Sequence, residues 1–123
     1  MVEVEYFFDS YAVIEILKKN GSYNPYLGFD VHLTVFNLAE IYYSVLDQYG
    51  EEKAETVYDE YKKCILEISE DILKDAMKFR RAHKKKRLSY ADCIGYVCAL
   101  ENKMKFLTGD TGFQGMKNVE FVK

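Results

Sequence analysis

The sequence predicts an α/β fold, a three-layer sandwich with a central, mostly parallel sheet of four to five strands between two layers of helices. Short apolar segments alternate along the chain with longer segments whose apolar residues recur at helical spacing. Strand-helix-strand connections are right-handed and place helices on both faces of a parallel sheet. The chain has 123 residues, 49% of them hydrophobic, which is enough for one core. We therefore expect a single domain over residues 1–123.

Residues 2–8 predict the first strand, because apolar and acidic residues alternate before the segment becomes fully apolar. The strand ends abruptly at Asp9. Ser10 is expected to cap the following helix, whose apolar residues keep helical spacing until Asn20-Gly21 provides a stop. The first unit is therefore a strand, an Asp-Ser pair and a helix.

The later elements are predicted from the same periodicity, caps and turn residues. Further strands are expected at residues 31–35, 64–68, 105–108 and 119–122. A long helix is expected after the strand at residues 31–35, ending near Gly50, and another over residues 51–63. Two more are expected, one from Ser69 into the basic residues 84–87 and one from Ser89 through Leu100.

Charge and composition exclude several classes of protein. The net charge of −3 gives no overall attraction for nucleic acid, so a polyanion would need a local basic patch or metal ions. Three cysteines cannot all pair within one chain, and none has zinc-site spacing, so we expect reduced thiols. No apolar run approaches the roughly 18 residues that span a bilayer, and residues 1–6 lack the basic start of a signal peptide. We expect a cytoplasmic protein with no membrane partner.

Four acidic residues stand where this topology brings chain segments to one edge of the sheet. In open parallel sheets, ligands collect outside the carboxyl ends of the strands. Asp9 and Asp110 follow apolar strands and are expected at that edge. Glu40 and Asp92 lie in the first turns of helices that begin near it. We therefore expect the four carboxylates to converge.

Converging carboxylates need a cation, because two like charges about 4 Å apart repel by roughly 4 kcal/mol at an effective dielectric constant of 20. Oxygen ligands with no nearby Cys or His pair suit Mg²⁺ or Mn²⁺ better than zinc. Such an ion lowers the pKa of a bound water and neutralises charge on a departing oxygen. The sequence therefore predicts a divalent metal site for phosphodiester chemistry.

Each acid also has a purely structural interpretation. Asp9 is placed to cap a helix, and Glu40 lies on a polar helix stripe. Ser89 and Asp92 have the spacing of a capping box, and Asp110 suits a turn. The joint placement of the four acids favours a functional site over four separate structural roles.

Four short motifs follow one another along the chain. They are Phe7-Phe8-Asp9-Ser10, Thr34-Val35-Phe36-Asn37-Leu38-Ala39-Glu40-Ile41, Leu88-Ser89-Tyr90-Ala91-Asp92-Cys93-Ile94 and Leu107-Thr108-Gly109-Asp110-Thr111-Gly112-Phe113. In this order and spacing they resemble the PIN domain family, and within it the short, stand-alone VapC-type ribonuclease toxins of prokaryotes. The resemblance covers nearly the whole chain.

The resemblance implies a metal-dependent endoribonuclease, in which four carboxylates bind Mg²⁺ or Mn²⁺ and activate water for attack on phosphorus. These catalytic residues are Asp9, Glu40, Asp92 and Asp110. By the same resemblance, three polar residues would orient a carboxylate or a bound water, namely Ser10, Asn37 and Thr108. Many family members carry another acid where this chain has Gly112, so we expect only one firmly bound ion.

A basic segment over residues 78–87 holds seven of the 17 Lys and Arg residues. One interpretation is a helix carboxyl terminus, where the dipole favours cations. The other is a patch that holds RNA phosphates beside the metal. The candidate RNA contacts are Arg81, Lys84, Lys85, Lys86 and Arg87.

Eleven tyrosines are many for this length, and five of them fall on the second and third expected helices. Most are expected in core or rim packing, yet such an excess also suits a surface for a partner. VapC-type proteins form homodimers and bind a VapB-type antitoxin, and the resemblance implies both partners here.

Other functions remain as alternatives. The chain could be a PIN nuclease that processes RNA outside a toxin-antitoxin pair, or a non-catalytic PIN domain that binds RNA or protein. A phosphatase of the haloacid dehalogenase type is disfavoured, because Tyr11 stands where its second Asp is needed. A receiver domain is disfavoured because its paired acids and late Lys have no counterparts.

Overall fold

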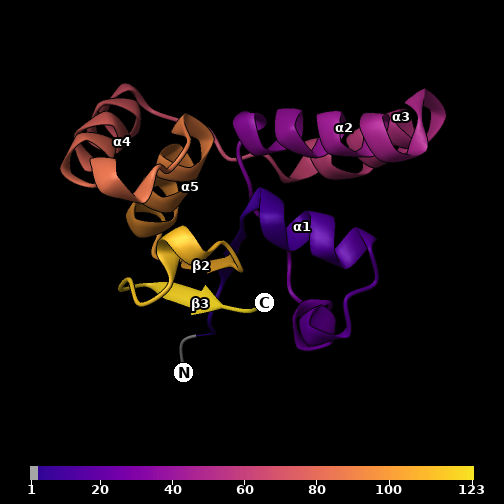
Figure 1. Ribbon diagram of the computed structural model, residues 1–123, viewed down its shortest axis with the longest axis horizontal. Coiled ribbons are helices and arrows are strands. Elements are labelled where there is room, and N and C mark those ends of the chain that lie inside the picture. The colour runs from indigo at the N-terminus through magenta and orange to yellow at the C-terminus, as the bar shows by residue number, and fades with distance from the viewer. Residues whose placement is uncertain (1–2) are drawn as a thin grey trace.

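The computed structural model describes residues 3–123, which fold into three strands, five α-helices and four short 3₁₀ helices (Figure 1). The strands are β1 (Tyr6–Phe8), β2 (Lys105–Thr108) and β3 (Val119–Phe121). The α-helices are α1 (Ser10–Leu17), α2 (Val35–Tyr49), α3 (Glu51–Tyr61), α4 (Glu70–Ala82) and α5 (Tyr90–Glu101). The 3₁₀ helices are η1 (Gly21–Tyr26), η2 (Lys62–Cys64), η3 (Lys84–Lys86) and η4 (Thr111–Phe113).

The sheet has the strand order β1-β2-β3, and both pairings are parallel. This confirms the predicted α/β fold with a parallel sheet. The predicted four to five strands were too many, because the described residues contain three. The expected strands at residues 31–35 and 64–68 form only isolated parallel bridges, one to Phe7 and one between Leu33 and Ile65.

The physical reason for the lower strand count is that a helical turn borders each segment directly and leaves room for only short bridges. Thr34 is already the N-cap of α2, and Val35 is its first residue. The turn η2 runs up to Cys64, directly before the bridging residue Ile65. In the first expected strand, residue 2 lies outside the described residues, and β1 itself starts only at Tyr6.

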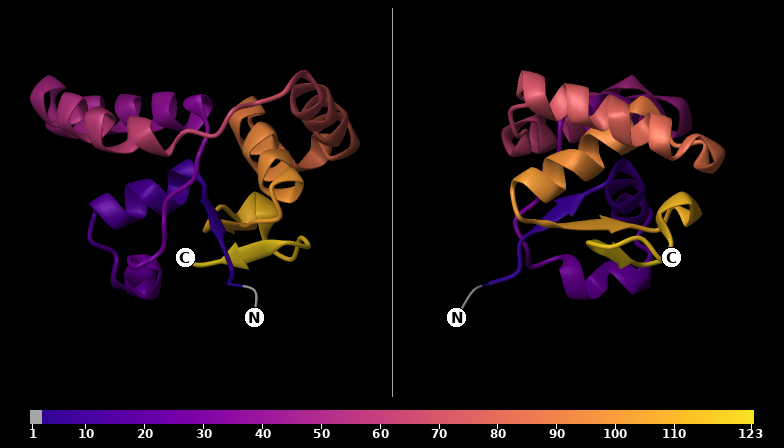
Figure 2. Two further views of the ribbon diagram at one scale, coloured as in Figure 1. Left: turned by 180° about the vertical axis from the view of Figure 1, so that it is seen from behind. Right: turned by 90° about the vertical axis from the view of Figure 1, so that its left-hand side faces the viewer.

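Helices cover both faces of the sheet, as Figure 2 shows with β1 between α1 on one side and α5 on the other. Phe7 and Phe106 are paired across the strands and stack with ring centroids 5.6 Å apart. Both rings lie against Gly95 of α5. The next residue, Phe8, points to the opposite face, where it shares a cavity with Ile16 of α1. All of these phenylalanines are buried.

The helix starts are set by side-chain caps, and one predicted cap was wrong. Asp9, not Ser10, caps α1, because the Asp9 Oδ1 atom accepts a hydrogen bond from the Ser10 amide. Ser10 is the first residue of the helix. Ser69 and Ser89 cap α4 and α5 as predicted. The correction at Asp9 matters because it fixes the carboxylate to the backbone.

The structure also bears on two compositional predictions. All three cysteines are free thiols, and Cys93 and Cys98 are buried. Within residues 3–123, no helix combines the length and the apolar character needed to cross a membrane.

The contact between α5 and the sheet can be tested at Gly95. A Cβ atom at this position would lie 3.0 Å from Phe7 and 3.3 Å from Phe106. We expect Gly95→Leu to lower the free energy of unfolding by about 1–3 kcal/mol, because its side chain overpacks this contact. Urea unfolding measures the change. As a control, Gly28→Ala should change stability by less than about 1 kcal/mol, because no atom lies within 4 Å of its Cβ position. Equal effects at both positions would contradict this packing.

Candidate functional site

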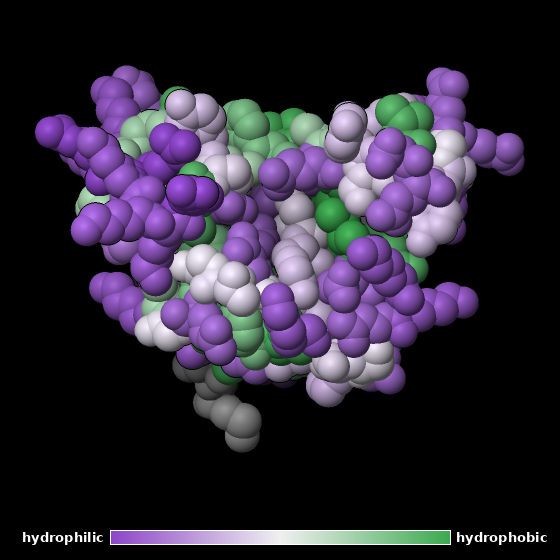
Figure 3. All heavy atoms as spheres, viewed as in Figure 1, coloured by the Kyte–Doolittle hydropathy of each residue, from purple (hydrophilic) through white to green (hydrophobic). Residues whose placement is uncertain are grey.

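Four segments meet at the carboxyl edge of the parallel sheet. Asp9 follows β1 directly, and Asp110 follows β2 after one residue. Glu40 lies in the second turn of α2, and Asp92 is the third residue of α5. Both views of the ribbon show the starts of α1, α2 and α5 close together (Figures 1 and 2). In the space-filling view, hydrophilic residues line a hollow between the α4–α5 pair and the α2–α3 pair (Figure 3).

Asp9 is the most buried acid of the site, with 2% of its surface exposed. Its Oδ1 atom accepts a hydrogen bond of 2.9 Å from the Ser10 amide, and its Oδ2 atom accepts one of 2.7 Å from the Thr108 hydroxyl. Burial and the charges of Asp92 and Glu40 together raise the pKa of Asp9 to about 8, against the lowering effect of the hydrogen bonds from Thr108 and Ser10.

A chain of hydrogen bonds connects Glu40 to the start of α2. The Ser10 hydroxyl donates to Glu40 Oε1 at 2.6 Å and accepts from the Asn37 amide group at 3.0 Å. Asn37 Oδ1 in turn accepts from the hydroxyl of Thr34 at 2.8 Å. Burial raises the pKa of Glu40, the hydrogen bond from Ser10 lowers it, and the charge of Asp92 raises it. The buried residues Ser10, Asn37 and Thr34 thus hold the Oε1 atom of Glu40 in place through this chain of hydrogen bonds.

Asp92 forms the predicted capping box with Ser89. Its Oδ2 atom accepts from the Ser89 amide at 2.8 Å, and its own amide donates to the Ser89 hydroxyl at 3.0 Å. Burial raises the pKa of Asp92, the hydrogen bonds with Ser89 lower it, and the charge of Asp110 raises it. The charge of Asp92 raises the pKa of both Asp9 and Glu40, and the charge of Asp110 raises that of Asp92. The four acids therefore form one electrostatically coupled group.

Asp110 caps the turn η4, since its Oδ1 atom accepts from the Gly112 amide at 2.9 Å. Its own amide donates to the Thr108 hydroxyl at 3.1 Å, so Thr108 connects Asp110 to Asp9. A Cβ atom at Gly112 would lie 2.8 Å from Leu88 and 3.3 Å from Asp110 Oδ1. An acidic side chain at this position would therefore require Leu88 to shift.

Glu40, Asp92 and Asp110 each have one carboxylate oxygen in a hydrogen bond and one oxygen without a partner in the described residues. Within residues 3–123, Glu40 Oε2, Asp92 Oδ1 and Asp110 Oδ2 accept no side-chain or backbone hydrogen bond. In the same residues, the ion pairs are formed by other side chains. The structural and functional interpretations of these acids are thus compatible, because one oxygen is fixed and the other is free.

The donor set suits a hard divalent cation, since it consists of carboxylate oxygens with no competing cation. In the described part of the chain, no three His, Cys, Asp or Glu side chains are arranged to hold one ion as they stand. Asp9 is held at both oxygens, whereas Glu40, Asp92 and Asp110 are each held at one. These three side chains are therefore the ones that can turn toward an ion.

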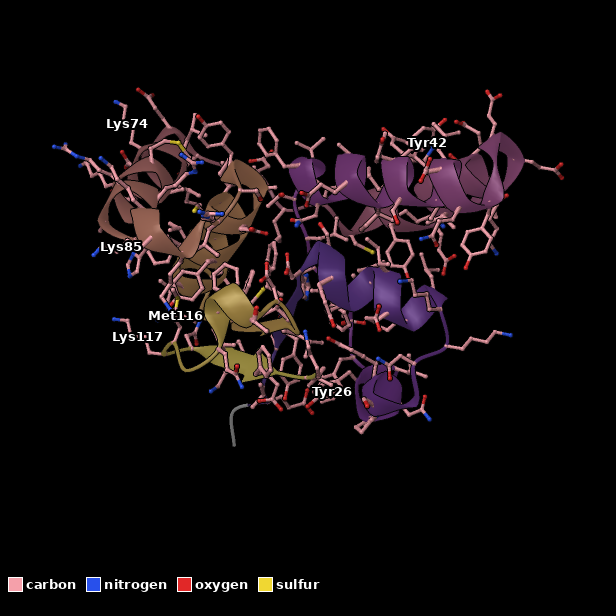
Figure 4. The ribbon with its side chains drawn as sticks, viewed as in Figure 1. Tyr26, Tyr42, Lys74, Lys85, Met116 and Lys117 are labelled. Atoms are coloured by element: carbon pink, nitrogen blue, oxygen red, sulfur yellow. The ribbon has the colours of Figure 1, made fainter. Side chains whose placement is uncertain are left out.

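The predicted basic residues all lie on the surface at the end of α4 and directly after it. Arg81 is on the last turn of the helix, Lys84–Lys86 form η3, and Arg87 follows with a left-handed φ of 54°. The segment approaches the site, because the Lys86 carbonyl oxygen lies 3.6 Å from the Cβ position of Gly112. Lys85 is at the outer side of the molecule (Figure 4).

The family resemblance named Ser10, Asn37 and Thr108 as orienting residues but did not name Thr34, whose hydroxyl donates a hydrogen bond to Asn37. The signal was present, because Thr34 and Asn37 have the three-residue spacing of a capping box, which the structure contains. The segment was instead assigned to a strand. Arg80, which holds the Leu88 carbonyl and contacts Tyr90, was also missed, and its role depends on tertiary contacts.

The fold and the site together define a class of protein, a parallel α/β domain with an acidic site at the carboxyl edge of its sheet. The chain belongs to the PIN domain family, whose family model matches residues 6–119. No curated protein matched the chain in a separate search.

Two solved structures share this fold. A toxin-antitoxin complex from Klebsiella pneumoniae contains a chain that is 17% identical and superimposes with a TM-score of 0.74, covering 94% of this chain and 96% of that one. The VapBC2 complex from Rickettsia felis, bound to a DNA fragment from its promoter, contains a chain that is 19% identical, with a TM-score of 0.72. That match covers 98% of this chain and 100% of the other. At these identities, the similarity shows a shared fold.

The raised pKa of Asp9 predicts that stability depends on pH. Between its ordinary value near 3.8 and about 8, the native protein binds more protons at Asp9 than the unfolded chain does. The resulting stabilisation is present near pH 4 and is lost as the pH rises to 8. In chelator, we expect the free energy of unfolding to fall from pH 5 to pH 8, and to fall less in Asp9→Asn. Urea unfolding at several pH values measures both slopes.

The matched control is Asp47→Asn, which removes an exposed acid from α2 and should keep the wild-type slope. Parallel slopes for the wild type and Asp9→Asn would show that Asp9 ionises with an ordinary pKa.

Proposed function

We propose that this PIN domain is a metal-dependent endoribonuclease that cleaves RNA phosphodiester bonds. The observation that carries the proposal is the buried carboxylate of Asp9, which is influenced by the charges of Asp92 and Glu40 without a neighbouring cation. A protein gains nothing in stability from like charges held together, so such an arrangement favours a role in binding. Membership of the PIN family supports nuclease chemistry at this site.

Four acids would hold Mg²⁺ or Mn²⁺ in this proposal, namely Asp9, Glu40, Asp92 and Asp110. When bound, the ion lowers the pKa of its water and neutralises charge on the leaving oxygen. Thr108 orients Asp9, and Ser10 orients Glu40, so both carboxylates are positioned in advance. Asp9 has to lose its proton before it can be a ligand, which makes metal affinity rise with pH.

We further propose that the protein is the toxin of a VapBC-type pair and that its partners are a VapB-type antitoxin and a second copy of itself. Support comes from the fold, which is shared with chains of two toxin-antitoxin complexes. Further support comes from exposed aromatic residues on α2, among them Tyr43 and Tyr49, which are 69% and 55% exposed. Exposed aromatic side chains are enriched at protein interfaces.

Cleavage of RNA tests the proposed activity directly. We expect the purified protein, free of any partner, to cleave RNA with Mg²⁺ or Mn²⁺ and to be inactive in chelator. Asp9→Asn and Asp92→Asn should each lower the rate at least about 100-fold, because each removes a charged oxygen ligand. Gel analysis of end-labelled RNA measures the rates. The control Asp47→Asn should keep wild-type activity.

Growth of cells that express the protein separates a toxin from a processing nuclease. A toxin should arrest growth, Asp92→Asn should abolish the arrest, and co-expression of a partner antitoxin should relieve it. Intact RNA with either ion, together with equal growth of wild type and Asp92→Asn, would overturn the nuclease proposal.

Metal binding can be measured without any substrate. At pH 8, we expect Mn²⁺ at about 100 times its Kd to stabilise the wild-type protein by about 2.7 kcal/mol. We expect the same concentration to stabilise it less at pH 6, where the Kd is higher. Calorimetric titration should give one firm site per chain, because Gly112 provides no further carboxylate. Asp9→Asn should lose the effect, and Asp47→Asn should keep it. Equal stabilisation of Asp9→Asn would place the ion elsewhere.

A further inference from the structure

Tyr90 is an exposed aromatic residue at the start of the helix that carries Asp92. It is the first residue of α5 and stands two positions before Asp92, and 61% of its surface is exposed. Arg80 of α4 lies over the ring, with its guanidinium carbon 4.3 Å from the ring centroid. Within residues 3–123, the Tyr90 hydroxyl makes no hydrogen bond with a protein group. The contact with Arg80 therefore positions the ring of Tyr90, while its hydroxyl group is not held by the described residues.

Arg80 is itself fixed, because its Nε atom donates a 3.0 Å hydrogen bond to the Leu88 carbonyl oxygen. Cation–π contacts at exposed sites contribute about 0.5–1 kcal/mol, so this one limits the motion of the ring. An exposed ring that is already ordered loses little entropy when a flat ligand stacks on it. Tyr90 is thus prepared for stacking at the rim of the site.

Two more cationic residues lie beside Arg80. Arg80, Lys84 and Arg87 line a recess of about 70 Å³ next to Leu88. None of them forms an ion pair with an acid in the described residues. The same loop reaches the acidic site, because Leu88 and the Lys86 carbonyl lie against Gly112, next to Asp110. The basic loop therefore connects the contact between Arg80 and Tyr90 with the acidic site.

We propose that Tyr90 is a stacking platform for one unpaired base of the RNA substrate, and that Arg80, Lys84 and Arg87 hold the adjoining phosphate. This inference rests on the proposed nuclease function. An unpaired base has a free aromatic face, whereas a base within a duplex is already stacked on its neighbours. An acidic peptide would satisfy the cations but would leave the ring without a partner, so the combination favours a nucleotide.

The chain lacks tryptophan, which makes a direct binding test available. Tyr90→Trp introduces a single tryptophan at the platform, and Tyr49→Trp introduces one at the end of α2 with a similar exposure of 55%. Tyr49 lies nine residues beyond Glu40, or about 13 Å along the helix axis. Fluorescence is followed in chelator, which prevents cleavage, during titration with an unstructured RNA of about ten nucleotides.

We expect this RNA to quench Tyr90→Trp by at least about 30%, as stacking on a base does, and to leave Tyr49→Trp unchanged. The same strand annealed to its complement should quench Tyr90→Trp much less. Equal quenching by single strand and duplex, or no quenching of Tyr90→Trp, would overturn the platform. Quenching by an oligoglutamate peptide but not by RNA would also overturn it and would indicate a protein partner.

Kinetics separate this inference from the proposed function itself. We expect Tyr90→Ala to raise KM about tenfold with kcat lowered less than about twofold, and Tyr90→Phe to restore KM because it keeps the ring. Wild-type KM in Tyr90→Ala would disprove the platform while leaving the nuclease intact. If no RNA is cleaved by the wild type, yet Tyr90→Trp is quenched by single strands, the nuclease proposal fails and the stacking site stands.

Discussion

The burial of one carboxylate, that of Asp9, is the constraint on which the rest of the site depends. It follows β1 directly and lies beneath the starts of the surrounding helices, with both oxygens held by hydrogen bonds. A carboxylate in this position resists ionisation, and burial together with the charges of the neighbouring acids raises its pKa to about 8. The local structure is therefore more stable with a proton on Asp9 than without one.

The hydrogen bonds around Asp9 show how a small domain holds several acids together. Each carboxylate is fixed to the protein through at least one oxygen, by a capped helix, a capped turn or a serine hydroxyl. Capping stabilises the helix start by about 0.5–2 kcal/mol, which offsets part of the repulsion among the acids. Asp9 is held at both oxygens, whereas the second oxygen of Asp92 and of Asp110 accepts no hydrogen bond from the described residues. In each of these two side chains, one oxygen thus has a structural role and the other stays free.

The surface beside this site differs from it in charge and in character. The acids lie at the sheet edge, whereas Arg80, Lys84 and Arg87 lie on and after α4, where Arg80 contacts the ring of Tyr90. A protein with a net charge of −3 does not attract a polyanion as a whole. In the proposed function, this local separation of charge lets an RNA strand extend from the acids toward the cations.

The sequence by itself determined the α/β class, the order of the five α-helices and of the three strands that form, and the acids at strand and helix ends. Periodicity, caps and turn residues are local signals and were sufficient for these features. The spacing of Ser89 and Asp92 was sufficient for their capping box. Tertiary structure decided which extended segments became strands, since Thr34 ends one of them by capping α2. It also decided the burial of Asp9 and the contact of Arg80 with Tyr90. These features depend on segments distant in the chain, and a local pattern carries no information about which segment will pack against another.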